Sequence, residues 1–268
     1  MRLLRLIWVG LVFRVKELTR SGLFVFTSVI EPLIFATLTY YLFSAGSKPE
    51  TVIYSALGAG MMGIWSSTLF ASGGAISWQR WQGTLELLVS APTPFVCVLL
   101  PLTLATSAIG IYSLTATLFW GRVVFGIPFS IEQPLAFVVA VPATILGLGL
   151  LGLLFATTFV LYRHANALSN MLEWPVLLVT GMLVPLSLLP GWSHPIAWAL
   201  APTWGVQAIR LAAMGNDVPS ETYLPFGTSP WPYVGMTLAL GAVYLALGMA
   251  FLGYFERAAR KQATLSLT

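Results

Sequence analysis

The stretch Ile76–Pro92, ISWQRWQGTLELLVSAP, turns amphipathic in a chain that is apolar on both sides of it. On a helical wheel, one face holds two tryptophans and two leucines: Trp78, Trp81, Leu85 and Leu88. The opposite face is polar: Gln79, Gln82, Glu86 and Ser90. We expect a bend at Gly83 and the end of the helix at Pro92. Such a helix lies along a membrane surface, where its polar face either docks a partner or belongs to an ordinary interfacial loop; periodicity leaves both interpretations open.

The composition indicates an integral membrane protein. Of 268 residues, 57% are hydrophobic and 8% are charged, and the mean hydropathy is +0.86. Soluble domains carry about 25% charged residues, so this chain cannot cover its surface with polar groups. Apolar segments of about 20 residues favour helices over a barrel. The net charge of +4 is too small to indicate a nucleic-acid partner.

The predicted fold is all-α, with a single transmembrane domain over residues 1–268. Six segments are long and apolar enough to span a bilayer: 23–43, 52–72, 95–119, 134–161, 168–189 and 231–254. Residues 2–20 predict an amphipathic interfacial helix, because four basic side chains share one arc: Arg2, Arg5, Lys16 and Arg20. We therefore expect the domain to consist of these parts in order: the interfacial helix 2–20, spans 1–2 over 23–72, the amphipathic stretch 76–92, spans 3–5 over 95–189, an external segment 190–230 and span 6 over 231–254.

The basic residues set the orientation. With the N-terminus inside, ten fall on the cytoplasmic side: Arg2, Arg5, Arg14, Lys16, Arg20, Arg80, Arg163, Arg257, Arg260 and Lys261. Three fall outside: Lys48, Arg122 and Arg210. Because cytoplasmic loops carry the excess of Lys and Arg, we expect both termini and residues 76–92 in the cytoplasm.

The external segment 190–230 is divided by prolines into pieces too short to span. Residues 192–201 and 203–214 are apolar, and two re-entrant helices dipping into the outer leaflet fit them best. An aromatic belt is expected around them: Trp192, Trp198, Trp204, Tyr223, Trp231 and Tyr233.

Two G-x-G-x-x-G matches lie inside predicted spans, at Gly58/Gly60/Gly63 and Gly147/Gly149/Gly152. A dinucleotide site needs a strand before the glycines, so close packing of helices is the better interpretation. The sequence contains no G-x-x-x-x-G-K-[ST] loop, no cluster of metal ligands and no plausible catalytic set. We therefore expect no enzyme activity, cofactor or metal in this chain.

Glu31 and Glu173 are carboxylates inside predicted spans. Such groups are costly unless they are paired or face water, which makes each a candidate for a substrate pathway. Both are also near cytoplasmic span ends, where water, Arg163 or a helix N-terminus could accommodate them. The sequence favours this second, structural interpretation.

Two blocks carry a resemblance to a known family. Gly83–Pro92, GTLELLVSAP, resembles the hallmark of the ABC-2 family of ABC transporter permeases, which holds drug-resistance, polysaccharide and nodulation-factor exporters. Thr180–Pro190, TGMLVPLSLLP, resembles its fifth span, and the residues that follow resemble its external re-entrant helices: Trp192, Pro195, Ala201, Pro202 and Arg210. The six-span layout with both termini inside is similar to this family, of the type V exporter kind, over the full chain.

The resemblance implies a half-transporter that works with two separate ABC ATPase subunits, which bind ATP and Mg²⁺, and with a second permease, identical or different. It implies that residues 2–20 are a connecting helix and that 76–92 is a coupling helix. The ATPase contacts would come from Trp78, Gln79, Arg80, Gln82, Gly83, Thr84 and Glu86. The family usually has acidic residues before Gly-Thr-Leu-Glu; this chain has tryptophan and glutamine there, which indicates hydrogen bonds and aromatic packing instead of salt bridges.

The sequence thus predicts the membrane subunit of an ATP-driven exporter of an amphipathic substrate (a drug, lipid or glycoconjugate) in a bacterial plasma membrane. The candidates for its substrate pathway are Glu31, Glu173, Tyr40, Thr180 and Met182. The alternative is a proton-coupled secondary carrier that uses Glu31 and Glu173. Against it, the chain shows no two-half repeat of broken spans.

Overall fold

The computed structural model describes residues 2–20, 22, 30, 33–38, 40–41, 49–81, 83, 96–126, 131–159, 165–219, 222 and 224–262. Every regular element in these residues is a helix, as the composition predicts. The longer ones are α1 (Arg2–Arg20), α3 (Pro49–Trp81), α5 (Val96–Ile109), α6 (Ile111–Val123), α7 (Pro134–Phe159), α8 (Ala165–Val179), α10 (Ala201–Met214) and α11 (Pro230–Gln262). Three short ones are η1 (Leu186–Leu188), η2 (Gly191–Ser193) and α9 (His194–Trp198).

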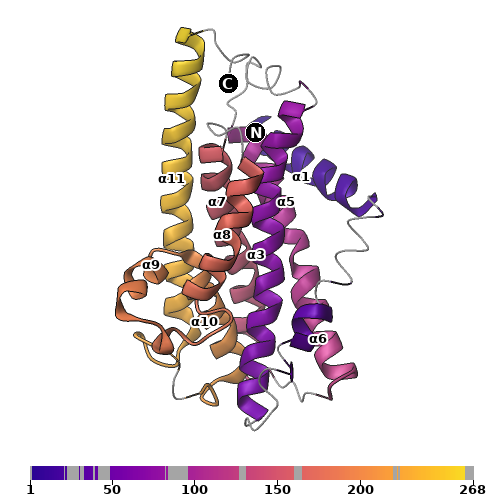
Figure 1. Cartoon of the computed structure of the whole chain (residues 1–268), viewed down its shortest axis with the longest axis vertical. Helices are drawn as coiled ribbons and strands as arrows, with labels where there is room; N and C mark the ends of the chain where they lie inside the picture. Colours follow the sequence, from indigo (N-terminus) through magenta and orange to yellow (C-terminus); the bar gives the residue numbers. More distant parts are fainter. Residues whose placement is uncertain are drawn as a thin grey trace.

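The helices form an elongated bundle with two distinct ends (Figure 1). One end holds α1, the last turns of α3 and the end of α11; we call it the Trp81 end. The other holds the start of α3, the end of α6 and the region of α9 and α10; we call it the Pro49 end. α1 and the end of α11 thus lie at the same end of the bundle, as the predicted orientation requires.

Four helical stretches are long and apolar enough to cross a membrane: Val52–Leu69, Val96–Val123, Pro134–Thr158 and Pro230–Tyr254. They match the predicted spans 52–72, 95–119, 134–161 and 231–254. The second of them is α5 and α6 joined through a turn at Gly110, where an added Cβ would lie only 3.0 Å from Ile64 Cα. The predicted span 23–43 falls mostly outside the described residues.

The predicted span 168–189 ends ten residues too late. α8 stops at Val179, and residues 180–185 form turns and bends before η1. Gly181 has φ +77°, a left-handed conformation that a helix cannot contain. Pro185 supplies no amide hydrogen for a further turn. Hydropathy stays high through residue 189, which is why the apolar window missed this break.

The glycines of the two G-x-G-x-x-G matches lie at helix–helix contacts. A Cβ on Gly60 in α3 would lie 3.1 Å from Leu114 Cα in α6. A Cβ on Gly152 in α7 would lie 2.8 Å from Thr68 Cγ2 in α3. Contacts this close exist only because the side chain is a hydrogen atom, so the packing interpretation of these motifs is confirmed.

α10, which covers most of the predicted re-entrant helix 203–214, is enclosed by the other helices. All 14 of its residues are buried, and it packs against α3, α7 and α11. The predicted aromatic belt is correspondingly split. Trp192, Trp198 and Trp231 are exposed, Trp204 and Tyr233 are in the core, and Tyr223 lies outside the described residues.

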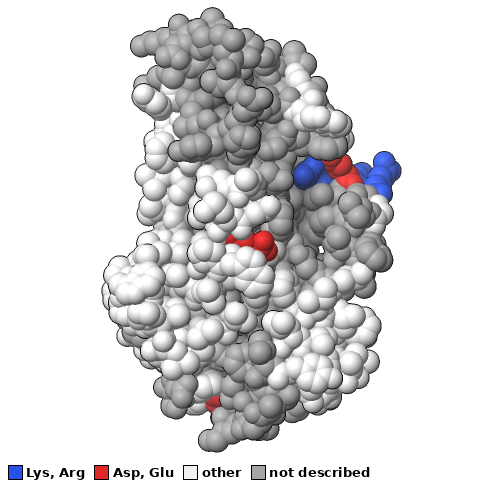
Figure 2. All heavy atoms as spheres, viewed as in Figure 1, with Lys and Arg blue, Asp and Glu red and all other residues white. Residues whose placement is uncertain are grey.

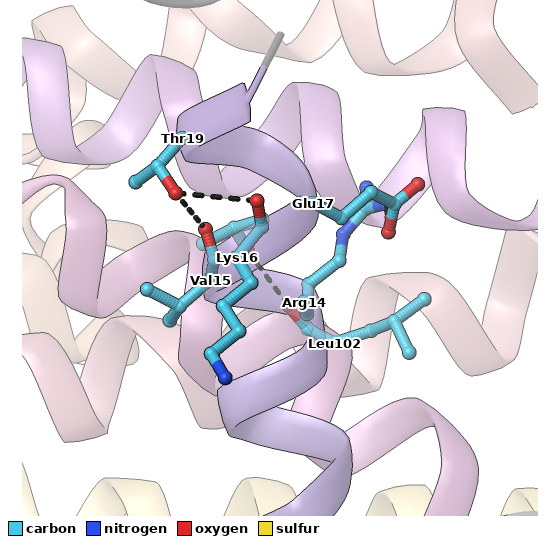
Figure 3. Close-up of polar contacts among 7 residues, drawn as sticks. Arg14, Val15, Lys16, Glu17, Thr19 and Leu102 are labelled. Atoms are coloured by element: carbon cyan, nitrogen blue, oxygen red, sulfur yellow. Dashed lines mark hydrogen bonds and ion pairs between the residues drawn. The ribbon is translucent and has the colours of Figure 1, made fainter.

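α1 packs along α5, and its contact point is Gly10, where a Cβ would lie 3.0 Å from Pro101 Cβ. Its outer surface carries Trp8 and Phe13, both exposed. Near its end, Arg14 Nη1 donates to Glu17 Oε2 at 2.8 Å (Figure 3). Apart from the charged side chains gathered over α1, the face shown in Figure 2 is mostly uncharged, as expected of a surface that meets lipid.

Candidate functional site

The end of α3 holds the start of the predicted coupling segment. α3 is a 33-residue helix that stays regular through Trp81, so residues 76–81 are its last turns. The sequence predicted a separate helix over 76–92, but residues 76–81 continue α3 without a break. Gly83 has φ +68°, which turns the chain away from the helix axis. Trp78, Gln79 and Arg80 lie in those last turns, whereas Gln82, Thr84 and Glu86 lie outside the described residues.

At the other half of the bundle, Arg210 of α10 is completely buried. Its guanidinium donates from Nε to the Tyr54 carbonyl at 3.2 Å, from Nη1 to the Gly181 carbonyl at 2.8 Å and from Nη2 to the Met182 carbonyl at 2.9 Å. Its Cζ also lies 3.5 Å from the centroid of the Tyr54 ring. No ion pair joins Arg210 to any residue that the structure describes.

This arrangement, which we call the Arg210 clamp, joins three elements: α10, the start of α3 and the segment after α8. A buried guanidinium is stable only when its donors are satisfied. Here backbone carbonyls and a π-face replace the usual carboxylate. The clamp thereby supplies donors to carbonyls beyond the end of α8 that have no helical partner.

Gly58 makes room for the clamp on α3. A Cβ at this position would overlap the Met182 carbonyl oxygen and lie 2.5 Å from Arg210 Nη2. The first glycine of the first G-x-G-x-x-G match therefore permits a backbone carbonyl and a guanidinium to reach the helix surface.

Glu173 of α8 lies against the middle of α3. Its Oε1 accepts a hydrogen bond of 2.7 Å from the Ser66 hydroxyl, and Ser66 is fully buried. Along α3, Ser66 and Gly58 are eight positions apart, and along the antiparallel segment Glu173 and Met182 are nine apart. Glu173 and the clamp therefore lie along one interface between α3 and the chain from α8 to Met182. We call this interface the seam between α3 and α8.

The other predicted pathway residues are only partly brought together. Thr180 and Met182 lie on this seam, both buried, and Thr180 Oγ1 donates to the Val176 carbonyl at 2.8 Å. Tyr40 lies elsewhere, with its ring stacked on Phe125 at 4.4 Å between centroids. Glu31 lies outside the described residues.

Comparison with known proteins gives the family. A profile described as ABC-2 type transporter matches residues 5–214, which is more than three quarters of the chain. The chain belongs to the ABC-2 type transporter family. No curated protein matches it in a sequence comparison. This ABC-2 chain is thus a multi-pass membrane component of a transporter, of a family that normally works with ATPase subunits, and the match reaches from α1 to the last residue of α10.

The clamp of the ABC-2 chain is not predicted by its sequence. Arg210 was predicted as an external basic residue that helps to set orientation. One signal was present: an arginine inside an apolar helix must find acceptors. The identity of those acceptors could not be read, because the Tyr54 carbonyl is 156 positions away in sequence.

Proposed function

We propose that this chain is the membrane-spanning permease subunit of an ATP-driven exporter in a bacterial plasma membrane. It moves an amphipathic substrate, such as a drug, lipid or glycoconjugate, outward. ATP and Mg²⁺ are bound by two separate ATPase subunits, and a second permease, identical or different, completes the transporter. The Trp81 end faces the cytoplasm, so that both termini are cytoplasmic.

The single observation that carries this proposal is the unbroken course of α3. The helix, Pro49–Trp81, is about 50 Å long at 1.5 Å per residue. It passes the clamp at Tyr54 near its start and ends just before the turn at Gly83. A helix packed along its length moves as a rigid element. Displacement of its Trp81 end by an ATPase would therefore reach the seam with α8 and the clamp, while the ATPase itself stays in the cytoplasm.

Gly83→Pro is expected to uncouple ATP hydrolysis from substrate. Proline fixes φ near −65° and cannot adopt the +68° of Gly83, so the contact segment would leave α3 in another direction. Because only differential contact with the ATPase states can drive the change, we expect substrate-stimulated hydrolysis to fall by about five- to tenfold. Glu86→Arg, which reverses the charge on the predicted contact face, should act in the same direction. The assay is ATP hydrolysis by the reconstituted complex with and without substrate.

Gly126→Pro is the matched control. Gly126 has φ +64° and follows α6 at the Pro49 end. At both glycines, a Cβ would meet no described atom within 4 Å, so the backbone conflict is the same and only the location differs. Equal loss of stimulation in the two variants, or none in Gly83→Pro with normal insertion, would contradict the coupling role.

Glu173 is our leading candidate for contact with a cationic substrate. In Glu173→Gln, the amide oxygen can still accept the bond from Ser66, so packing is kept while the charge is lost. We expect transport of cationic amphiphiles to fall by about tenfold, the effect of one interaction of about 1.4 kcal/mol, and transport of neutral ones to change little. Measurement is by uptake of paired cationic and neutral dyes into inverted vesicles.

The proton-coupled carrier predicts a different result for the same variant. Transport would run on a pH gradient without ATP, and Glu173→Gln would stop it for every substrate. That outcome would overturn the ATP-driven mechanism.

A further inference from the structure

Gln207 of α10 is a buried amide that has no hydrogen-bond partner in the described part of the chain. The residue is 2% exposed, and neither Nε2 nor Oε1 has a hydrogen-bond partner among the described residues. Thr203, one turn earlier, is 3% exposed, and its hydroxyl is likewise unpartnered within the described part of the chain. Buried polar groups are nearly always paired, so unpaired ones in one place require a physical reason.

Gln207 lies on the same face of α10 as Arg210. The two are three positions apart, a spacing that makes side chains neighbours on a helix surface. The three hydrogen bonds of Arg210 to backbone carbonyls use one N–H on each of its three nitrogens, and a guanidinium has five N–H donors. An acceptor with no partner among the described residues therefore lies one helical turn from a cation that is held by three carbonyl groups and the Tyr54 ring.

The Gly181 and Met182 carbonyls, which accept hydrogen bonds from Arg210, differ in which other donor could replace it. Met182 O could be satisfied by the amide of Leu186 if α8 were to extend. Gly181 O could not, because the residue four positions later is Pro185, which has no amide hydrogen. Without Arg210, the Gly181 carbonyl cannot be satisfied by an extension of α8 and needs water or another donor. Release of the clamp is therefore expected to hydrate this segment.

We propose that Gln207 is the second resting place of Arg210 and that the pair forms a two-position latch on the segment 180–189. In the position seen here, Arg210 holds the Gly181 and Met182 carbonyls against α3, and Gln207 is unpaired. In the other position, Arg210 donates to Gln207 Oε1, and the segment leaves Gly58 and takes up water. Both are positioning residues: they set which arrangement of the segment is populated.

The unpaired amide is what makes the latch reversible. A leucine or methionine at position 207 would pack without cost in the position seen here, which we call closed. When the segment leaves, in the open position, it would give the guanidinium only the Tyr54 carbonyl as an acceptor. Glutamine is unfavourable in the closed position and favourable in the open one, which brings the two arrangements closer in free energy. This inference concerns the chain alone and holds whichever energy source drives transport.

The test uses a reporter cysteine on the segment. Val184→Cys is introduced into full-length protein with Cys97→Ser, reconstituted in lipid nanodiscs, and the rate of reaction with a membrane-impermeant maleimide is measured. Gln207→Glu gives Arg210 a stronger acceptor, so we expect the labelling rate to rise by about fivefold or more. Gln207→Met removes the acceptor, so we expect the rate to fall at least about threefold, with a melting temperature no lower than that of the parent.

Opposite shifts distinguish a latch from a structural role, because two damaging substitutions would change the rate in the same direction. A second reporter, Ile131→Cys on the exposed loop before α7 (47% exposed), should label at the same rate in all variants. Equal or same-direction changes at position 184 overturn the proposal. If Gln207→Glu yields no folded protein, Gln207→Met alone decides: a labelling rate equal to or above the parent's overturns it. Since no ATPase is present, failure of the coupling mechanism would leave this result unaffected.

Discussion

Arg210→Ala is expected to be the most destabilising single substitution of a charged side chain in the described part of the chain. It leaves two buried carbonyls beyond α8 without their donor, those of Gly181 and Met182, and a cavity where the guanidinium was. It also removes the bond to the Tyr54 carbonyl, which keeps its helical bond within α3. Each buried acceptor left unpaired costs roughly 1–3 kcal/mol, so we expect a loss of about 3–5 kcal/mol in the free energy of unfolding. In a protein of this size that is a fall of about 10 °C in melting temperature, measurable by thermal unfolding in detergent.

Two further variants test whether the stabilisation by Arg210 depends on the geometry of its donors or on its charge. Arg210→Lys keeps the charge, but a compact ammonium cannot reach three separated carbonyls with a fork of donors. We expect it to recover less than half of the loss. Lys16→Ala removes an exposed cation from α1 and should change stability by no more than about 0.5 kcal/mol. If Arg210→Lys behaved like the parent, the positive charge alone, and not the three-donor fork of the guanidinium, would hold the segment.

Much of the fold could be predicted because it depends on local composition. α3, α7 and α11 are long apolar runs, and the length needed to cross a bilayer leaves few other assignments. The helical course of α1 and the packing role of the glycine motifs follow from periodicity and from side-chain size. These features require no knowledge of which distant residue is the neighbour.

The break after α8 and the burial of α10 could not be predicted in this way. The apolar run through residue 189 conceals a break that only Gly181 and Pro185 signal. A helix such as α10, with its aromatic and apolar side chains, reads equally well as lying in lipid or in protein, because both surroundings are apolar. The decision depends on neighbours far away in sequence.

The candidate site was predicted in part for the same reason. Glu173 was found because a carboxylate inside an apolar span is conspicuous. Its partner Ser66, 107 positions away, could not be identified. Arg210 was predicted as an external basic residue within the short helix 203–214, although three hydrogen bonds to distant carbonyls hold it in the core.

Gly58→Ala is expected to reverse the ordinary effect of replacing a helical glycine by alanine. In a helix interior, alanine normally adds about 0.5–1 kcal/mol of stability over glycine. At position 58, the new Cβ would overlap the Met182 carbonyl oxygen and lie 2.5 Å from Arg210 Nη2. Neither is the end of a free side chain, because both are held by the clamp. We therefore expect a net loss of about 2–4 kcal/mol, from overpacking together with a broken hydrogen bond.

Gly235→Ala in α11 is the matched control, since it makes the same change inside another long helix where a Cβ would meet no described atom within 4 Å. Gly235→Ala should be neutral or slightly stabilising, whereas Gly58→Ala should lower the melting temperature. We therefore expect the melting temperatures of the two variants to differ by about 10 °C. The latch gives Gly58→Ala a second consequence: by forcing Met182 away from α3, it should raise the labelling of Val184→Cys as Gln207→Glu does. If alanine at position 58 left both stability and labelling unchanged, the segment after α8 would not be held in close contact with α3, and both the clamp and the latch would be contradicted.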